Sequence, residues 1–189
     1  MKKRLGFAMC GSFCTHKEAL SVMEEVSAEF DVIPILSQAA SSWDTRFGSA
    51  NNLIEKVEKI TSHPPIVTVV DAERLGPAEP LDYMMICPCT GNTAAKIACG
   101  ITDTPVTMAA KAHLRGNKPL LIALATNDAM SANLKNIATL IEKKNVYFVP
   151  MRQDSPIAKP HSLVADFSLC TSALAEMIEM RQPRPIFLT

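Results

Sequence analysis

The chain has 189 residues, which is the length of one domain and enough to bury a substantial core without disulfide or metal staples. Nineteen basic residues balance nineteen acidic ones, so no global field would attract nucleic acid or an anionic membrane. The apolar run after residues 1–4 already contains Gly6, is far below transmembrane length and lacks a signal-peptide cleavage pattern. Six cysteines are too few for a disulfide scaffold. We therefore expect a cytoplasmic protein with reduced thiols and without nucleic-acid or membrane partners.

Strand and helix patterns alternate along the whole chain. Apolar runs of strand length predict six strands, at residues 4–10, 31–37, 66–70, 83–87, 119–125 and 146–149. Apolar residues at helical spacing predict six helices, at residues 15–30, 51–62, 93–99, 104–115, 131–144 and 162–180. Residues 38–49 and 151–160 are expected to be loops. The alternation predicts a three-layer α/β/α fold with a doubly wound, six-stranded parallel sheet.

A single domain is expected to contain all these elements, over residues 1–181. The tail 182–189 ends in an Ile-Phe-Leu trio that would be poorly soluble if free, so we expect it to pack on the body or on a neighbouring subunit. Pro34 places the second strand near a sheet edge or at a bulge. We expect a homo-oligomer, formed through the tail and through the loop around Trp43.

The segment at residues 81–100, LDYMMICPCTGNTAAKIACG, combines a buried strand, a polar loop and the start of a helix. Its unbroken apolar run suits a parallel strand covered on both faces, and Pro88 is expected to end that strand. In an open α/β sheet, ligands bind where the carboxyl ends of strands meet helix N-termini. The candidate ligand contacts in this loop are Thr90, Gly91, Asn92 and Thr93, of which Asn92 or Thr93 would be the N-cap.

The turn after the first strand, CGSFCT at residues 10–15, is a second candidate site. It can hold a phosphate through backbone N–H groups, through the Ser12 and Thr15 hydroxyls and through the helix dipole. The glycine spacing of a dinucleotide fingerprint is absent, and so is a Walker loop. An ordinary turn without a ligand is the alternative interpretation.

Two further segments offer contacts for a substrate. Arg46 lies beside Asp44 in a long loop and could clamp a carboxylate bidentately, although a surface ion pair with Asp44 is the alternative. Asn127 and Met130 follow the strand at residues 119–125. They are therefore expected at the same edge of the sheet as the loop of the central segment.

The cysteines and histidines match no catalytic or metal-binding motif. Cys10, Cys14, Cys87 and Cys89 gather at two strand ends, but their spacings are unusual for zinc, and Cys87 would point away from Cys89. We expect buried structural thiols and no metal. The four histidines are scattered, and only His16 lies near the proposed site.

Three segments together resemble the flavoprotein superfamily of flavin-containing cysteine decarboxylases and prenyl-transferring flavin proteins. The stretch PCTGNTAAKIACGITD at residues 88–103 is similar to that family's P-A-S-A-N-T segment, Gly11-Ser12 to its first phosphate-binding turn, and ATNDAM at 125–130 to its substrate loop. The resemblance implies FMN as a possible cofactor. By position, Gly11, Ser12, Phe13 and Ser37 would hold the flavin phosphate, and Thr90, Gly91, Asn92 and Thr93 would contact its ribityl chain and ring.

The chain also departs from the decarboxylases of that family. Leu124 and Thr126 stand where the substrate loop has Pro and Met, and no residue clearly replaces the catalytic histidine. The whole sequence, including the MCGSFCTHKEA, SSWDTRFG and MRQDSP segments, resembles most a branch from spore-forming bacteria whose members are one half of a two-subunit synthase.

That branch implies a specific activity. Its members work with a second subunit similar to NAD(P)-binding dehydrogenases, and together they oxidise a dihydro-dicarboxylate to the aromatic pyridine-2,6-dicarboxylate. Arg46, Asn127 and Met130 would bind the substrate, and no residue stands out as the general base. The alternatives are an FMN-dependent decarboxylase or prenyltransferase, and a non-catalytic scaffold for the second subunit.

Overall fold

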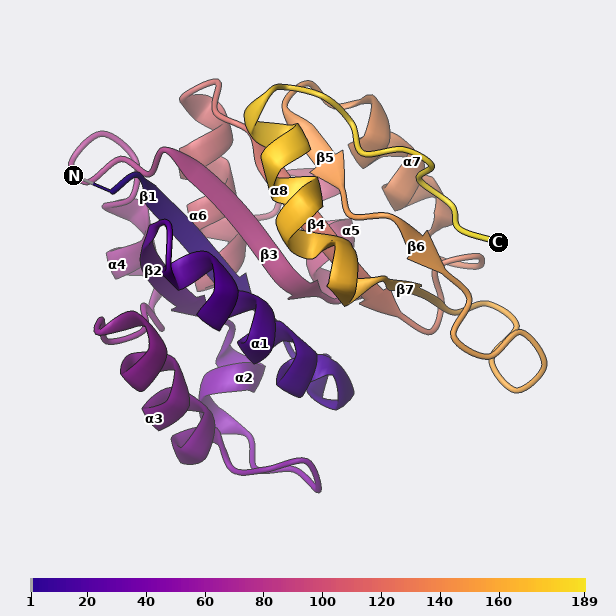
Figure 1. Cartoon of the computed structure of the whole chain (residues 1–189), viewed down its shortest axis with the longest axis horizontal. Helices are drawn as coiled ribbons and strands as arrows, with labels where there is room; N and C mark the ends of the chain where they lie inside the picture. The colour runs from indigo at the N-terminus through magenta and orange to yellow at the C-terminus, as the bar shows by residue number, and fades with distance from the viewer. Residues whose placement is uncertain (1) are drawn as a thin grey trace.

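The computed structural model describes residues 2–189, which form three layers with a sheet in the middle (Figure 1). The strands are β1 (Arg4–Met9), β2 (Asp31–Leu36), β3 (Tyr83–Cys89), β4 (Leu120–Thr126), β5 (Val146–Phe148), β6 (Met151–Arg152) and β7 (Leu163–Ala165). The α-helices are α1 (His16–Ser27), α2 (Gln38–Ser42), α3 (Ala50–Thr61), α4 (Val69–Glu73), α5 (Gly91–Cys99), α6 (Pro105–Arg115), α7 (Leu134–Glu142) and α8 (Cys170–Ile178).

The sheet has the order β2-β1-β3-β4-β7-β6, and β5 pairs with the first half of β4. Strands β1 to β5 are parallel, whereas β7 runs antiparallel to β4 and to β6. The three-layer prediction is confirmed, but a sheet of six parallel strands was wrong, because the sheet has seven strands and β7 runs against the others. Strand β2 lies at an edge of the sheet, as Pro34 predicts.

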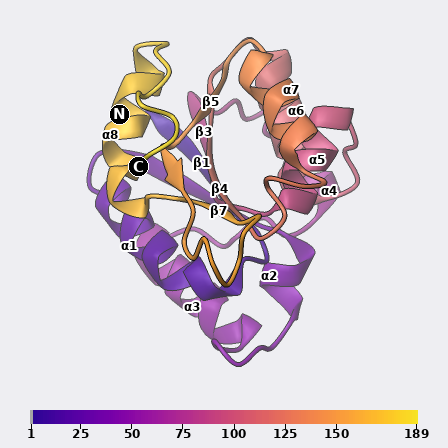
Figure 2. The same cartoon turned by 90° about the vertical axis from the view of Figure 1, so that its right-hand side faces the viewer.

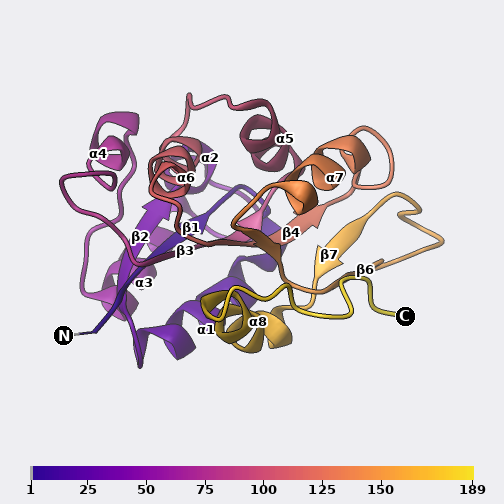
Figure 3. The ribbon, with the colours of Figure 1, turned by 90° about the horizontal axis from the view of Figure 1, so that it is seen from above.

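Helices cover both faces of the sheet, as the view from above shows (Figure 3). Helices α1, α3 and α8 pack on one face, and α4, α5, α6 and α7 pack on the other. The central strands β1, β3 and β4 are buried almost throughout, which explains their unbroken apolar sequences. Figure 2 shows the same arrangement from the side, with α1, α3 and α8 on one side of the strands and α4 to α7 on the other.

Residues 66–70 do not form the expected strand. Ile66 makes a single bridge to Ile35, and the chain then enters α4. The Thr68 hydroxyl accepts the Asp71 backbone N–H at 3.0 Å and donates to the Asp71 carboxylate at 2.6 Å. This N-cap outweighs the strand preference of the β-branched run.

Residues 151–180 also differ from the prediction of a loop followed by one long helix. Strands β6 and β7 form an antiparallel hairpin whose second strand pairs with the end of β4. Helix α8 begins only at Cys170, because the Asp166 side chain caps a short 3₁₀ helix at Phe167–Leu169 before it. Residues 38–49 are likewise not all loop, since they contain α2.

The tail runs alongside β6. The Met151 backbone N–H donates to the Ile186 carbonyl at 2.8 Å, and the Leu188 N–H donates to the Met151 carbonyl at 2.9 Å. Ile186 packs against the core, whereas Phe187 is 54% exposed. The contact of this tail with a neighbouring subunit stays a prediction. No helix within residues 2–189 is both long and apolar enough to cross a membrane.

His113 predicts a loss of stability in acid. Its side chain is 2% exposed, its Nε2 lies 2.8 Å from the Pro119 carbonyl, and burial lowers its pKa from 6.5 to about 4. Between these two pH values the unfolded chain binds a proton that the folded chain does not, so stability falls as the pH falls through this window. The loss amounts to about 3 kcal/mol at roughly 1.4 kcal/mol per pKa unit.

Urea unfolding at pH 7 and pH 4.5 measures this dependence. We expect His113→Gln to flatten it and His161→Gln, which changes an exposed histidine, to leave it as in the wild type. An equally steep dependence in the His113→Gln variant would contradict the assignment.

Candidate functional site

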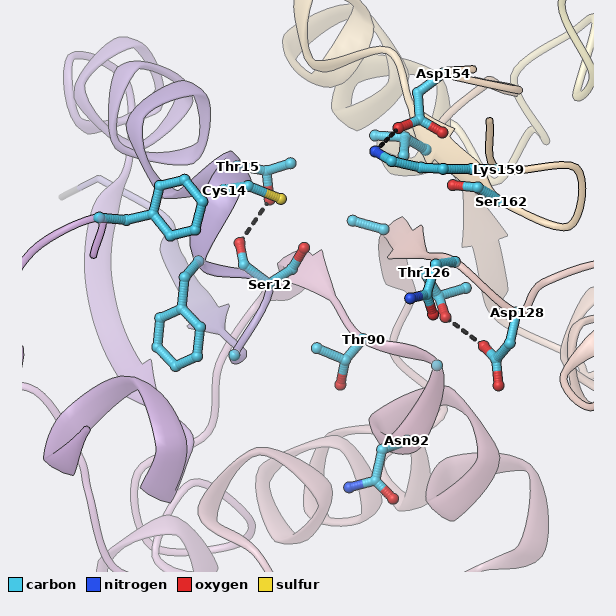
Figure 4. Close-up of a pocket in the computed structure, with 17 residues that line it drawn as sticks. Ser12, Cys14, Thr15, Thr90, Asn92, Thr126, Asp128, Asp154, Lys159 and Ser162 are labelled. Carbon is cyan, nitrogen blue, oxygen red and sulfur yellow. Dashed lines mark hydrogen bonds and ion pairs between the residues drawn. The ribbon is translucent and has the colours of Figure 1, made fainter. Parts of the chain in front are cut away.

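A cavity of about 670 Å³ opens at the carboxyl ends of β1, β3 and β4 (Figure 4). It lies where chain connections leave the sheet in opposite directions, between β1 and β3, which is the usual ligand site of an open α/β sheet. Its lining residues are Gly11, Ser12, Phe13, Cys14, Thr15, Phe47, Thr90, Gly91, Asn92, Ala125, Thr126, Asn127, Asp128, Asp154, Lys159, Ser162 and Val164.

The turn after β1 presents hydrogen-bond donors to this cavity. The Thr15 backbone N–H and hydroxyl both donate to the Ser12 carbonyl, at 3.0 and 2.9 Å, which closes the turn before α1. Within residues 2–189, the N–H groups of Phe13 and Cys14 and the Ser12 hydroxyl have no hydrogen-bond partner. These donors lie at the positive end of α1, so the turn is suited to an anion.

A second set of donors comes from the loop between β3 and α5. Pro88 does not end β3 as predicted, because the strand continues to Cys89 through a register shift. Thr90 is the N-cap, rather than Asn92 or Thr93, and its hydroxyl accepts the Thr93 backbone N–H at 3.3 Å. The N–H groups of Gly91 and Asn92 have no partner in the described chain and lie at the positive end of α5.

The two loops are bonded to each other. The Cys10 backbone N–H donates to the Pro88 carbonyl at 3.1 Å, and the Thr93 hydroxyl donates to the Cys10 sulfur at 3.3 Å. Thr93 is 7% exposed, so it supports the cavity from behind and does not line it. The expected contact between Thr93 and a ligand stays a prediction.

The loop after β4 is built around Asp128. The Thr126 hydroxyl donates to its carboxylate, and the Asn133 side-chain amide contacts both carboxylate oxygens at 2.9 Å. Asn136 in turn donates to Asn133 at 2.8 Å. The Thr126 hydrogen bond, more than any other contact, lowers the pKa of Asp128, so this carboxylate is ionised at neutral pH.

Gly91 packs directly against this carboxylate network. A Cβ at Gly91 would lie 2.6 Å from both the Asn133 amide nitrogen and the Thr126 hydroxyl, and 2.9 Å from an Asp128 oxygen. Only glycine permits this approach, which brings the N-terminus of α5 and the β4 loop together.

The hairpin of β6 and β7 forms the remaining wall. Lys159 donates to Asp154 at 2.6 Å across the loop of the hairpin, and Ser162 lies beside them (Figure 4). The Lys159 ammonium, followed by the Ser162 hydroxyl, lowers the pKa of Asp154, and Asp154 raises that of Lys159. A hydrogen bond of 3.0 Å from the Met130 N–H to the His161 carbonyl ties this hairpin to the β4 loop.

The cavity includes most of the residues that the sequence singled out, but not all. Gly11, Ser12, Phe13, Thr90, Gly91, Asn92 and Asn127 line it. Ser37 does not, because it is the N-cap of α2 and accepts the Ala40 N–H at 3.3 Å. Arg46 stacks over the Phe47 ring at 4.8 Å, and Met130 faces solvent. Within residues 2–189, Arg46 forms no ion pair with Asp44, and the Asp44 carboxylate accepts the Ala50 N–H at 2.9 Å.

Cys10, Cys87 and Cys89 are buried thiols, as expected, whereas Cys14 is exposed and lines the cavity, so the expectation of a buried thiol was wrong for Cys14. Burial raises the pKa of Cys10 to about 11 and raises those of Cys87 and Cys89 as well, so these thiols stay protonated. Cys87 packs on the opposite face of the sheet from Cys89, as expected, and the register shift between Ile86 and Cys89 is what separates them, since residues two apart in a regular strand share a face. Burial lowers the pKa of His16, whose Nε2 lies 2.7 Å from the Cys10 carbonyl. Within residues 2–189, no three metal-ligating side chains gather.

Comparison with known proteins finds relatives along the whole chain. The model of the family described as Flavoprotein matches residues 1–180. The B subunit of dipicolinate synthase from Bacillus subtilis (strain 168) is 40% identical over 187 residues, which cover 98% of this chain and 94% of that protein.

Solved structures give the same result. The crystal structure of the dipicolinate synthase B subunit from Bacillus halodurans has a TM-score of 0.90 and 39% identity, and the match covers 100% of this chain and 99% of that one. Burkholderia xenovorans DmrB in complex with FMN has a TM-score of 0.72 at 18% identity, over 95% of this chain and 97% of that one, and shares the fold.

The close approach at Gly91 predicts a clear effect of a single methyl group. Gly91→Ala would push apart the Thr126, Asp128 and Asn133 side chains, and we expect it to lower the free energy of unfolding by about 1–3 kcal/mol. It would also move the pKa of Asp128 back towards its ordinary value, which a carboxyl NMR titration measures.

Gly76→Ala is the matched control, because a Cβ there would meet nothing closer than 3.4 Å. Equal stability of the Gly91→Ala and Gly76→Ala variants in urea would refute the packing argument.

Proposed function

The chain belongs to the Flavoprotein family, and on that basis we propose that it binds FMN and serves as one half of a two-subunit enzyme that forms dipicolinate, pyridine-2,6-dicarboxylate. The family match bears out the resemblance seen in the turn at Gly11-Ser12 and in residues 88–103. The full-length similarity to the dipicolinate synthase B subunits of two Bacillus species supports the specific activity.

The observation that carries the proposal is the convergence of two helix N-termini on one cavity. The turn before α1 and the start of α5 both direct unpartnered N–H groups to the same side of the sheet. A cavity of about 670 Å³ falls within the range of roughly 300–1,000 Å³ that is typical of cofactor and small-molecule sites. The donors and the volume therefore fit FMN, with its phosphate at residues 11–14.

The residues of the cavity have distinct tasks in such a reaction. Gly11, Ser12 and Phe13 would hold the phosphate, and Thr90, Gly91 and Asn92 would position the ribityl chain and ring. FMN, when bound, would supply a hydride acceptor, and the alternative acceptor is the nicotinamide of the partner subunit. Aromatising the dihydro-dicarboxylate also releases a proton.

Asp128 is the residue best placed to accept that proton. Its carboxylate lies at the cavity and is ionised at neutral pH. The other carboxylate of the lining, Asp154, forms an ion pair with Lys159. The hydrogen-bond donors to Asp128, by contrast, are the neutral side chains of Thr126 and Asn133. No candidate for a general base was apparent in the sequence, because Asp128 is recognisable only through its place beside the α5 N-terminus.

The partner in this proposal is the A subunit of dipicolinate synthase, a dehydrogenase-like protein that would bring NAD(P). The complex would work in the mother cell of a sporulating bacterium. The absence of a catalytic histidine in the cavity lining disfavours the alternative of a flavin-dependent decarboxylase. The alternative of a non-catalytic scaffold that binds no ligand does not account for the N–H groups that the β1 turn and the start of α5 present to the cavity.

Flavin binding gives the first test. We expect FMN to bind more tightly than riboflavin, because the phosphate meets the N–H groups and the hydroxyl of the β1 turn. Ser12→Ala should weaken FMN roughly tenfold and riboflavin little, since one hydrogen bond to a charged group is lost. Flavin absorbance and fluorescence titrations measure both affinities.

The control for this titration is Ser21→Ala, on the exposed side of α1. Equal affinities for FMN and riboflavin would place no phosphate in the β1 turn. If neither flavin binds, the hydride acceptor belongs to the partner subunit.

Reconstitution gives the second test. Mixing this chain with its partner A subunit, NAD(P)⁺ and freshly generated dihydrodipicolinate should yield dipicolinate, detected by its ultraviolet absorbance. Each of the two proteins alone is the control and should give a much lower rate. Full activity of the partner without this chain would contradict a catalytic role for it.

A further inference from the structure

The cavity contains a single cationic side chain. Of the residues that line it, only Lys159 carries a positive charge, whereas Asp128 and Asp154 carry negative charges. Arg46, the cation expected from the sequence, stacks over Phe47, which lines the cavity, but Arg46 is not itself a lining residue. A ligand with two carboxylates therefore has one side chain in this chain with which it can form an ion pair.

Lys159 can exchange its present ion-pair partner, Asp154, for an anionic ligand. Its ion pair with Asp154 spans the loop of an exposed hairpin, and the Lys159 side chain is 54% exposed. Exposed pairs of this kind contribute little to stability, because water screens them. Asp154 can therefore give up the ammonium group to another anion at small cost.

The hairpin keeps its shape without that ion pair. The Lys159 backbone N–H donates to the Ser155 carbonyl at 2.7 Å, and the Ser162 N–H donates to the Lys159 carbonyl at 3.1 Å. The Gln153 amide closes the loop by donating to the Pro160 carbonyl at 2.9 Å. Because the backbone positions Lys159 by itself, its side chain is available for a ligand.

Lys159 also lies close to the loop that would meet the substrate. The hydrogen bond from Met130 to the His161 carbonyl, and the pairing of Thr126 with Leu163, tie the hairpin to the end of β4. The β1 turn, which is suited to the flavin phosphate, approaches the cavity from another element (Figure 4). The N–H groups of that turn already provide donors for a phosphate, which leaves the ammonium group of Lys159 for a carboxylate of the substrate.

We propose that Lys159 binds a carboxylate of the dicarboxylate substrate, exchanging Asp154 for it when the substrate enters the cavity. This inference depends on the proposed function, since that function supplies the dicarboxylate. Lys159 takes the place of Arg46, which the sequence predicted as the residue that contacts a substrate carboxylate. The exchange also gives Asp154 a role, as a competitor that holds the ammonium group at the cavity until a ligand displaces it.

The experiment measures the binding of pyridine-2,6-dicarboxylate to the FMN-loaded complex of this chain with its partner, by calorimetry. Lys159→Met should weaken this binding roughly tenfold or more, because an ion-paired hydrogen bond is lost. Lys159→Arg should restore most of it. Lys135→Met, which removes an exposed lysine on α7 away from the cavity, should leave it unchanged.

Asp154→Asn distinguishes ligand binding from a structural role. If Lys159 leaves Asp154 to bind the ligand, removing the competing charge should tighten dicarboxylate binding several-fold. If the ion pair only supports the hairpin, the same change should weaken binding or leave it as it was, and either result would overturn the proposal.

FMN affinity and the wild-type complex separate the remaining outcomes. Lys159→Met should leave FMN affinity unchanged, and a loss of FMN affinity with unchanged dicarboxylate binding would assign Lys159 to the flavin phosphate instead. Dicarboxylate binding that is equal in wild type and Lys159→Met would refute the role of the lysine alone. A wild-type complex that neither binds the dicarboxylate nor forms it would refute the proposed function and this inference with it.

Discussion

The parallel pairing of β1 with β3 is the constraint on which the site depends. These strands are far apart in the sequence but adjacent in the sheet, and the chain leaves them in opposite directions. Their carboxyl ends therefore open a cavity that neither connection fills. The hydrogen bonds that join Cys10 to Pro88 and Thr93 keep the two loops in register. Both sets of anion donors owe their common direction to this single pairing.

The cavity is suited to anions mainly through backbone dipoles. Two helix N-termini provide N–H groups, and the lining side chains add two carboxylates and one ammonium group. Such a site favours a ligand that is neutral over most of its surface and anionic at its ends, since a bulky polyanion would meet Asp128. Flavin and a small dicarboxylate both have this character. The hydrogen bonds from Thr126 and Asn133 explain how Asp128 can remain ionised there, and the close approach at Gly91 places the positive end of α5 beside the same carboxylate.

The sequence predicts the parallel part of this molecule well and the additions to it poorly. Strands β1, β3 and β4 are buried on both faces, so their apolar runs identify them without ambiguity. The strand prediction for residues 66–70 was wrong because the N-cap that Thr68 forms with Asp71 starts a helix there, against the β propensity of the run. The positions of Gly11, Ser12 and Thr90 at the cavity were predictable, because small polar residues after a buried strand indicate the ligand edge of the sheet. Asp128 and Lys159 were not, since tertiary hydrogen bonds and the hairpin bring them to the cavity.

The hairpin of β6 and β7 changes what the cavity can recognise without changing how the cavity is built. The loops after β1, β3 and β4 form the floor of the cavity, and because backbone hydrogen bonds join them to buried strands, the core fixes their geometry. The hairpin adds Asp154, Lys159 and Ser162 from the loop at residues 153–162, and its strands pair with β4 and with the tail. Residues there can be replaced at little cost to folding, whereas a change at Gly91 disturbs the packed floor. A family that shares one floor for flavin can therefore differ in substrate through this hairpin, which is where the single cation of the cavity lies.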